Sequence, residues 1–207
     1  MPNYCTNMLS IPRQPGLHRA DIETVMRSLR GPNGPLDFEA ILPIPEALRN
    51  LCRGGTRIDG AYHTLWREEP LPGGGIRKIP LSVEEQEQLR QNHGADNPFD
   101  WCIENWGTKW NALTWEVDWA FATFRFDTAW SPPLGFAMAL SRKYPGIRFE
   151  LSFVETGCDM NGWIQYYQGE EWRSEDYDMN SDEGRENADR VGIILPDPED
   201  ESETVEA

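Results

Sequence analysis

The sequence predicts an α+β fold in which helices cover one face of an antiparallel sheet. Residues 4–11 and 147–154 alternate apolar and polar side chains, as strands with one buried face do. Residues 18–30 instead place apolar side chains three and four positions apart, which is the spacing of an amphipathic helix. Six of the nine tryptophans fall between Trp101 and Trp130. Because indoles bring large apolar surfaces, this clustering indicates where the core lies.

The first half of the chain predicts a strand, a helix, a second strand and an insertion. Pro12 ends the first strand, and Gly31 and Pro32 end the helix. We expect a second strand from Leu36 that stops before Pro43, because proline cannot donate to a sheet ladder. A short helix is expected after it, from Glu46 to Leu51. Residues 53–80 are rich in glycine and proline and predict a long irregular segment pinned by Leu65 and Trp66.

Three further helices carry clear start signals. Ser82 and Glu85 form a capping box, and Gly94 marks the end of the helix that follows. A second helix is expected from Asn97 or Pro98 to Trp106. The third begins after Ser131-Pro132-Pro133, with Ser131 as its N-cap, and ends before Pro145-Gly146.

The remaining strands complete the predicted sheet. Residues 113–117 and 123–127 both alternate, but their phases do not match, so a tight hairpin or a bulge must lie between them. Strands at 147–154 and at about 160–168 follow. The order of elements predicts a ferredoxin-like split βαβ antiparallel sheet with helices on one face. We expect one domain over residues 1–169, with a long loop and helix insertion at about residues 46–111.

The negative charge of the chain is concentrated at its C-terminus. The net charge is -16, and residues 170–207 hold fifteen acidic residues against three arginines. We therefore expect an acidic C-terminal tail over 170–207, which is either a solubilising segment or an attraction for a basic host protein. Such a surface repels phosphate backbones, so nucleic-acid binding is disfavoured.

Cysteine spacing and the absence of long apolar runs set the expected compartment. Cys5, Cys52, Cys102 and Cys158 form no C-x-x-C pair, and no zinc pattern joins them to the three histidines. We expect buried free thiols and no cofactor. No leader-like start or run of 18 apolar residues is visible, so a cytoplasmic protein without membrane association is expected.

Five sequence motifs together resemble those of a known family. They are MPNYCTN at 1–7, DFEAILPIPEAL at 37–48, ENWGTKWNA at 104–112, FDTAWSPP at 126–133 and LSRKYPGIRFELSFVETG at 140–157. In this order they are similar to the YubB ferredoxin-like domain family, whose members occur on phages, plasmids and other mobile elements. The resemblance covers roughly residues 1–170. It implies an antiparallel sheet with helices on one face and supplies no activity.

Four carboxylates are candidates for a metal site. Asp100 and Glu104 are one helical turn apart, and with Asp127 and Glu155 they could hold magnesium or manganese if they converge. Alternatively, Asp100 and Glu104 face solvent or accept hydrogen bonds from indoles and Lys109. No metal-binding motif accompanies them, so we expect no metal site unless the four carboxylates lie close together in the folded protein.

A patch in the tryptophan-rich region is the candidate binding site. Lys109 lies between two tryptophans in the sequence, which favours packing of its ammonium against an indole face. Ser131 has no nucleophile-elbow context and no nearby histidine, so no catalytic residue is assigned. We expect the indoles between Phe99 and Pro133 to form a buried core without a cavity. The candidate binding residues are Trp106, Lys109, Trp110, Asn111, Trp130 and Ser131.

Three functions follow from these features. The first is a non-catalytic protein-interaction module of a phage or mobile element, which binds a host factor with its acidic surface and mimics the charge of nucleic acid. The alternative is a metal-dependent enzyme acting on a nucleotide or phosphoester through the four carboxylates. The second alternative is single-stranded nucleic-acid binding on the sheet face, where strand phenylalanines would stack bases. The sequence leaves the oligomeric state open.

Overall fold

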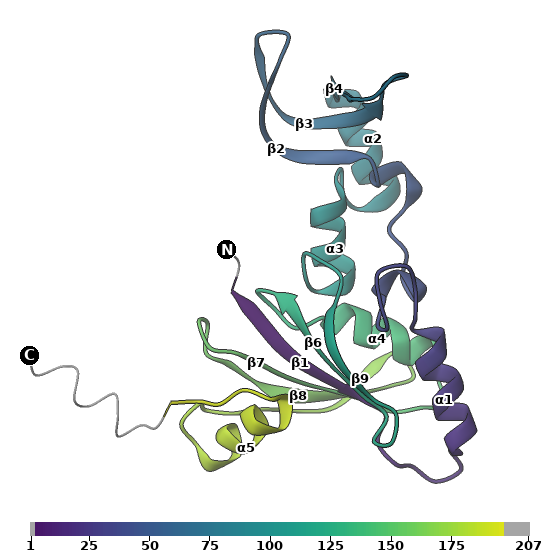
Figure 1. The fold of residues 1–207 in the computed structure, drawn as a ribbon, viewed down its shortest axis with the longest axis vertical. Coiled ribbons are helices and arrows are strands. Elements are labelled where there is room, and N and C mark those ends of the chain that lie inside the picture. The colour runs from purple at the N-terminus through teal and green to yellow at the C-terminus, as the bar shows by residue number, and fades with distance from the viewer. Residues whose placement is uncertain (1–2, 197–207) are drawn as a thin grey trace, which may run out of the picture.

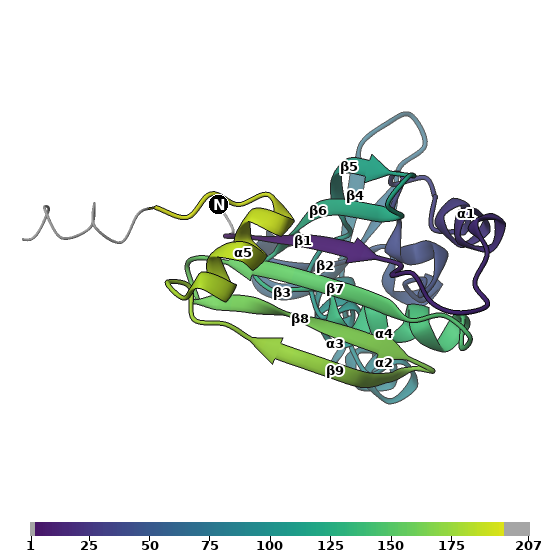
Figure 2. The ribbon, with the colours of Figure 1, turned by 90° about the horizontal axis from the view of Figure 1, so that it is seen from below.

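A six-stranded antiparallel sheet forms the body of the protein. The computed structural model describes residues 3–196, and the strands run in the order β5-β6-β1-β7-β8-β9 (Figure 1, Figure 2). The α+β, ferredoxin-like fold expected from the sequence is therefore confirmed. The strands are β1 (Tyr4–Ser10), β5 (Leu113–Asp118), β6 (Thr123–Ala129), β7 (Phe149–Glu155), β8 (Met160–Tyr167) and β9 (Glu170–Asp176).

The central strand β1 separates the two halves of a split βαβ unit. It pairs antiparallel with β6 on one side and with β7 on the other, so β6 and β7 are parallel to each other. Helix α4 (Leu134–Lys143) connects them. Strands β1 and β5 form a second such unit, because both pair antiparallel with β6 and are therefore parallel to each other, with α1 in the connection between them. The second strand of this unit is β5 and not the strand expected from Leu36.

Alternation along β1 sends side chains to two different cores. Cys5 and Leu9 belong to the main core, together with α1 (Arg19–Ser28) and α4. Met8 points to the opposite face and packs beneath α5 (Asp182–Val191) in a second, smaller cluster. Helices therefore cover both faces of the sheet, with α5 alone on the second face (Figure 2).

The second strand expected from Leu36 is wrong. Residues Phe38–Ala40 form a single 3-10 turn, which Asp37 caps by accepting a hydrogen bond from the backbone of Glu39. The Asp37 carboxylate thus offers this backbone a local partner in place of a sheet ladder, which is the ordinary effect of such side chains. Further along, the expected short helix is a 3-10 turn over Glu46–Leu48.

The segment 53–80 is also ordered, contrary to the expected irregular loop. It forms most of a separate three-stranded antiparallel sheet, seen at the top of Figure 1, with β3 in the centre. Its glycines and prolines lie mainly in turns or at strand ends, which is why their frequency misled the sequence analysis. The strands are β2 (Leu51–Ile58), β3 (Ala61–Pro70) and β4 (Ile76–Pro80).

Two helices connect the small sheet to the main one, as their start signals predicted. Helix α2 (Val83–His93) has the expected capping box of Ser82 and Glu85 and ends at Gly94, whose φ is 82°. Helix α3 (Pro98–Trp106) begins at Asn97, whose side chain accepts a hydrogen bond from the backbone of Asp100. Gly94 and Gly107 both adopt the left-handed conformation that favours glycine at a helix end.

The folded domain extends beyond residue 169, where the sequence analysis placed its C-terminal boundary. Residues Glu170–Asp176 extend the sheet as β9, and α5 packs on β7, β8 and β1. In α5, Asn187 donates hydrogen bonds to Asn161 Oδ1 at 2.8 Å and to the Gly162 carbonyl oxygen at 3.1 Å. Charge alone predicted a tail, whereas a short apolar stripe with Ala188 and Val191 buries this helix. The rest of the expected tail, 197–207, lies outside the described residues.

The cysteines are free, but they are not all buried. Cys5 and Cys102 lie in the core, Cys52 is partly buried and Cys158 is exposed. Burial raises the pKa of the Cys102 thiol to about 12, and the nearby charge of Glu39 adds to the effect. The buried thiols therefore stay protonated at neutral pH and behave as small apolar side chains. No helix in the described part of the chain is long and apolar enough to cross a bilayer.

Candidate interaction surface

Two of the clustered tryptophans form the centre of the core. Trp106 is buried, and its indole N–H donates a hydrogen bond to the carbonyl oxygen of Leu42 at 2.8 Å. Its ring packs edge-on against Trp101 and Phe38, with centroid separations of 5.9 and 5.5 Å. Trp106 is therefore a structural residue, and its indole is not available for binding as the sequence analysis had expected.

The other four clustered tryptophans are exposed. The expectation that the indoles between Phe99 and Pro133 form a buried core is therefore wrong for most of them. Most of them lie on or beside β5, an edge strand of the main sheet with no neighbour on one side. We call Trp110, Leu113, Trp115, Trp119 and Phe121 the β5 rim. These residues are between 38% and 76% exposed. The signal available in the sequence was that the alternation of residues 113–117 does not match that of residues 123–127. In the structure, the register shifts within β5, between Thr114 and Glu116, and this changes the direction of the side chains along the strand.

Two cations lie against indoles of the β5 rim. The Lys109 ammonium is 5.5 Å from the Trp110 ring centroid and 5.0 Å from that of Phe99. At the other end of β5, the Arg27 guanidinium is 6.0 Å from the Trp119 ring centroid. Lys109 therefore packs on Trp110 as expected, but not on Trp106, whose ring turns inward. Such contacts hold an exposed ring in place, which reduces the entropy that binding would cost.

Trp130 extends the exposed surface from the end of β6. Its φ of 71° is unusual for a residue with a bulky side chain, and its ring is 48% exposed. The backbone is held there by a hydrogen bond from Trp130 N–H to the carbonyl oxygen of Asn3 at 3.0 Å. The hydroxyl of Thr128 also donates to the carbonyl oxygen of Ser131 at 2.8 Å. A strained backbone held in this way is a common mark of functional sites.

Ser131 has a different role from the expected helix cap. Its hydroxyl donates to the carbonyl oxygen of Gly107 at 2.6 Å, and Pro133 occupies the cap position of α4 without a side-chain hydrogen bond. The hydroxyl of Thr108 makes a similar link, to the carbonyl oxygen of Ala129 at 3.0 Å. Ser131 thus ties the end of α3 to the end of β6 and fixes the corner that carries Trp130.

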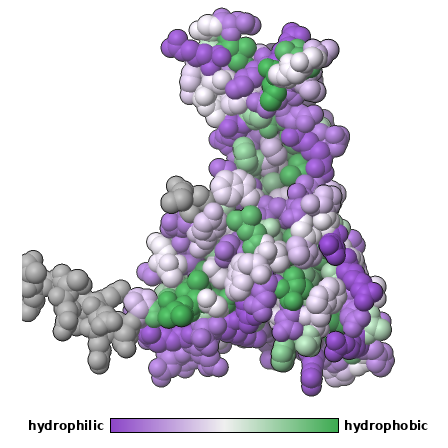
Figure 3. Space-filling model, viewed as in Figure 1, coloured by the Kyte–Doolittle hydropathy of each residue, from purple (hydrophilic) through white to green (hydrophobic). Residues whose placement is uncertain are grey.

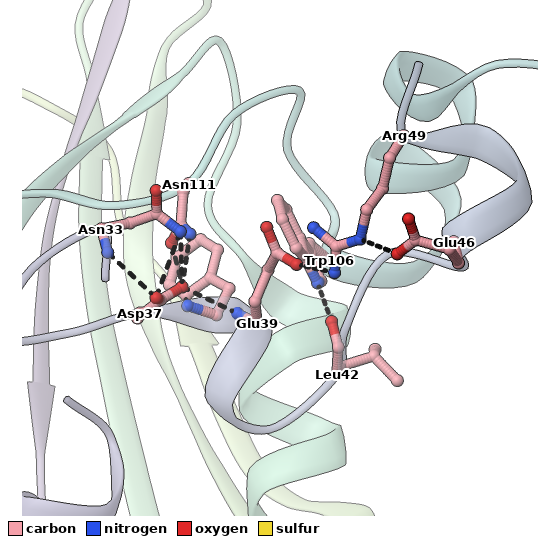
Figure 4. A network of polar contacts seen from close by, with 9 residues as sticks. Asn33, Asp37, Glu39, Leu42, Glu46, Arg49, Trp106 and Asn111 are labelled. Atoms are coloured by element: carbon pink, nitrogen blue, oxygen red, sulfur yellow. Dashed lines mark hydrogen bonds and ion pairs between the residues drawn. The ribbon is translucent and has the colours of Figure 1, made fainter. Parts of the chain in front are cut away.

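Asn111 belongs to a buried polar network around Asp37 (Figure 4). Its amide donates to Asp37 Oδ1 at 2.6 Å, and its side-chain oxygen accepts from the backbone of Phe38 at 2.9 Å. Asn33 donates to the same carboxylate from its backbone and its side chain. Asn111 is therefore directed inward and holds the segment after α1 against the chain entering β5.

The four candidate metal ligands do not converge, because Asp100 and Glu104 share a cavity beside α3 whereas Asp127 and Glu155 lie on the main sheet. On α3, Asp100 forms an ion pair with Arg53 and accepts a hydrogen bond from Asn97 at 2.9 Å. On the main sheet, Asp127 accepts from the hydroxyl of Thr6 at 2.9 Å. Within residues 3–196, no three histidine, cysteine or acidic side chains are grouped so that they could hold a metal ion. The convergence that a metal-dependent enzyme required is therefore not found in the described part of the chain.

Glu155 is the least satisfied of these carboxylates. It is buried at the end of β7, and one of its oxygens accepts from the backbone of Gly157 at 3.1 Å. Its other oxygen has no hydrogen-bond partner among the described residues. Glu104 lies elsewhere, in a cavity of about 480 Å³ between α2, α3 and β3 that also contains Arg53, Arg90 and Asp100.

The sheet offers no stacking platform of the kind that single-stranded nucleic acid needs. The strand phenylalanines considered for this role are all in the main core. Arg125 forms an ion pair with Glu116 at 2.9 Å, and Arg148 lies 5.0 Å from the Trp172 ring centroid. The buried phenylalanines are Phe124, Phe126, Phe149 and Phe153.

Two cavities lie beside the exposed rings. The face drawn in Figure 3 is mainly hydrophilic, with scattered hydrophobic patches. A cavity of about 410 Å³ lies under Trp119, between β5 and α1. A larger cavity of about 730 Å³ opens between the end of β1, the β5–β6 turn and α5. The protein is therefore a ferredoxin-like domain with exposed aromatic rings and two cavities beside an unpaired strand edge.

Comparison with known proteins agrees with this class. Residues 105–194, from the end of α3 through α5, match the family model described as "Ferredoxin-like domain in Api92-like protein". This match includes β9 and α5, in agreement with the moved domain boundary. The crystal structure of a protein api92 from Yersinia pseudotuberculosis is similar at 10% identity and a TM-score of 0.39, over 86% of this chain and 98% of that one. No match was found among the curated proteins.

Proposed function

We propose that the protein is a non-catalytic interaction module that binds another protein through the β5 rim and Trp130. The observation that carries the proposal is the concentration of exposed aromatic rings on one edge strand and at its two ends. Tryptophan, tyrosine and phenylalanine are enriched in protein interfaces, and they supply much of the binding energy at interface centres. The resemblance of the five sequence motifs to the YubB family supports the proposal that the protein is encoded by a phage, plasmid or other mobile element.

The edge strand favours a partner that contacts side chains more than backbone. The bulge between Thr114 and Glu116 interrupts the regular ladder of β5, and Glu116 places a charge beside it. Both features hinder continuous pairing with another strand. The rings of Trp115 and Trp119 remain accessible, and their two-angle side chains lose little entropy on binding. We therefore expect the partner to present pockets or an apolar groove to these rings.

A double variant, Trp115→Ser with Trp119→Ser, tests the proposed surface. If these rings are central to the interface, partner capture from a host lysate should fall by about thirtyfold or more, since central aromatic anchors typically contribute 2 kcal/mol or more. Capture is quantified by pull-down followed by mass spectrometry of the retained proteins. Thermal unfolding checks that the fold survives, because both rings are exposed.

Trp172→Ser is the matched control for that experiment. Trp172 is also an exposed tryptophan, 43% accessible, but it lies on β9 at the opposite edge of the sheet. It should retain the partner. Equal loss of capture in the control and in the double variant would show that the β5 rim has no special role.

The acidic end of the chain is tested separately. Residues 197–207 carry six acidic and no basic residues. If they attract a basic partner, ending the chain at residue 196 should leave the unfolding midpoint unchanged while weakening capture, and the remaining capture should depend less on salt. A salt titration of both chains measures this. Unchanged capture at low salt would remove the acidic segment from the proposal.

The larger deletion of 170–207 is not suitable for that purpose. It would remove β9 and α5, which cover Met8 and Val154 on the second face of the sheet. Loss of binding in such a chain would report unfolding as well as lost charge. The shorter deletion separates the two effects.

A further inference from the structure

The cavity between the end of β1, the β5–β6 turn and α5 is rich in arginine, although the chain as a whole is strongly negative. It has a volume of about 730 Å³, within the range of small-molecule sites. Its ionisable lining comprises four arginines and two acids, in a chain whose net charge is -16. Those residues are Arg13, Arg19, Arg125, Arg190, Asp118 and Glu150. Arg19, Arg125 and Arg190 form ion pairs with Glu23, Glu116 and Glu150, so within the described residues Arg13 is the lining arginine that remains free to bind an anionic ligand.

Several of these groups are already fixed by contacts with other residues of the protein. Arg125 is held by Glu116 and by the carbonyl oxygen of Arg190, to which it donates at 3.4 Å. Arg190 forms an ion pair with Glu150, which also accepts a hydrogen bond from Gln165 at 2.6 Å. The guanidinium groups therefore do not have to be ordered when a ligand binds, which lowers the cost of binding.

Arg13 is the guanidinium that has no fixed partner. It forms no ion pair or side-chain hydrogen bond with any residue from 3 to 196. Its neighbour Gln14 anchors the loop, because the Gln14 side chain donates to the carbonyl oxygen of Arg148 at 3.4 Å and accepts from the backbone N–H of Arg148 at 3.0 Å. Arg13 thus lines the cavity from an anchored loop, and its five donors are available.

Two hydroxyl groups line the cavity beside these cations. Ser10 and Thr123 are directly paired across β1 and β6, so their side chains lie on the same face. Only 8% of the surface of Ser10 is exposed, and its hydroxyl faces the cavity without a hydrogen bond to another residue in the described part of the chain. The two hydroxyl groups are therefore available to donate to a ligand.

The walls of the cavity indicate that the ligand has an organic part. Ile11, Leu17 and Ile22 line one side, and Phe121 lies in the β5–β6 turn with 76% of its surface exposed. The turn is held by the Asp118 carboxylate, which accepts from the backbone of Ala120 and Phe121 at 2.8 and 3.1 Å. An exposed ring at the edge of a cationic cavity can stack on a planar ring of a bound molecule.

We propose that this cavity binds a phosphate monoester with a planar organic group, the chemistry of a nucleoside monophosphate. Arg13, Ser10 and Thr123 donate to the phosphate, and Phe121 stacks on the ring. A phosphate monoester carries about −1.5 to −2 charges at neutral pH, which complements the unpaired guanidinium of Arg13. Guanidinium groups suit phosphate because their donors form paired hydrogen bonds. The phosphate donors lie outside the β5 rim, whereas Phe121 belongs to both sites, so Arg13→Gln separates this proposal from the protein surface proposed above.

The test uses the full chain and two probes, inorganic phosphate and adenosine monophosphate, titrated by calorimetry and by amide chemical shifts. Both should bind at the same site, and the nucleotide should bind more tightly than phosphate. Arg13→Gln should weaken both probes by about tenfold or more, the effect of losing a charged hydrogen bond. Phe121→Ser should weaken the nucleotide alone. Unchanged unfolding midpoints are expected for both variants because Arg13 and Phe121 are exposed.

Arg57→Gln is the matched control, because Arg57 is exposed on β2 in the small sheet and outside the cavity. It should bind both probes as the parent chain does. Equal weakening by Arg57→Gln and Arg13→Gln would overturn the site, as would no binding of either probe at about 10 mM, where even weak specific ligands bind. If phosphate binds and the nucleotide binds no more tightly, the role of Phe121 is wrong.

Discussion

Trp106→Ala is expected to lower the free energy of unfolding by about 3–5 kcal/mol, the usual range for removing a large buried aromatic side chain. Trp106 is almost fully buried at the end of α3 and packs against Trp101 and Phe38. Its removal would leave a cavity between α3 and the segment after α1. It would also remove the only donor that the structure shows for the Leu42 carbonyl oxygen within residues 3–196. Urea unfolding followed by far-ultraviolet circular dichroism measures the loss.

Trp110→Ala serves as the comparison, because its ring is part of the exposed β5 rim. It should change the free energy of unfolding by less than about 1 kcal/mol, as exposed substitutions usually do. Equal effects of the two substitutions would contradict the division of the indoles into buried and exposed sets. If Trp106→Ala does not fold at 25 °C, the milder Trp106→Phe, which keeps most of the ring volume, should fold with an intermediate loss of stability.

Asp37→Asn is expected to destabilise the protein at neutral pH by on the order of 3 kcal/mol, because charged hydrogen bonds to a buried carboxylate are lost. Asp37 is fully buried and accepts from Asn111, Asn33 and the backbone of Glu39. Burial alone raises the pKa of this carboxyl, but the hydrogen bonds from Asn111, Asn33 and Glu39 outweigh it and hold the pKa below its usual value. The ionised form is therefore the one that stabilises the fold.

The pH dependence of that variant follows from the direction of the shift. A carboxyl group whose pKa is lowered by folding contributes its full stabilisation above the unfolded value of about 3.9, and this is lost as the pH falls through the folded value. The advantage of the parent chain over Asp37→Asn should therefore be constant between pH 5 and 7 and shrink below about pH 4. Urea unfolding of both chains across this range measures the difference.

The control for the pH experiment is Asp59→Asn. Asp59 is exposed in the turn between β2 and β3, with a φ of 49° that asparagine also tolerates. Its stability curve should run parallel to that of the parent chain. A gap between the parent and Asp37→Asn that stays constant down to pH 3 would show that Asp37 gains nothing from being ionised in the folded state.

Elements with strong local signals were predicted well from the sequence. The capping box at Ser82, the Asn97 start of α3 and the alternation in β1 and β7 all depend on residues a few positions apart, and each element is found where it was expected. The expected strand at Leu36 is wrong because Asp37 caps a turn and is itself held by Asn111, 74 positions away in the chain. No local pattern contains that contact.

The candidate site was predicted less well, for a related reason. The sequence located the tryptophan-rich region but could not tell which indoles pack inward. Trp106 and Asn111 proved structural, whereas Trp110 and Trp130 are exposed. The arginine-lined cavity was missed altogether, because Arg13, Arg125 and Arg190 come from three distant segments and meet only after β1, β6 and α5 pack together.

The sequence by itself determined the α+β class, most helix limits and the concentration of aromatic residues between α3 and α4, because these depend on local composition and periodicity. The tertiary structure alone decided that residues 170–191 belong to the folded body, that most of the clustered indoles face outward, and that an arginine-lined cavity exists in an acidic chain. The physical reason is that the burial and the charge of a site depend on all the residues around it, and most of those residues are distant in the chain.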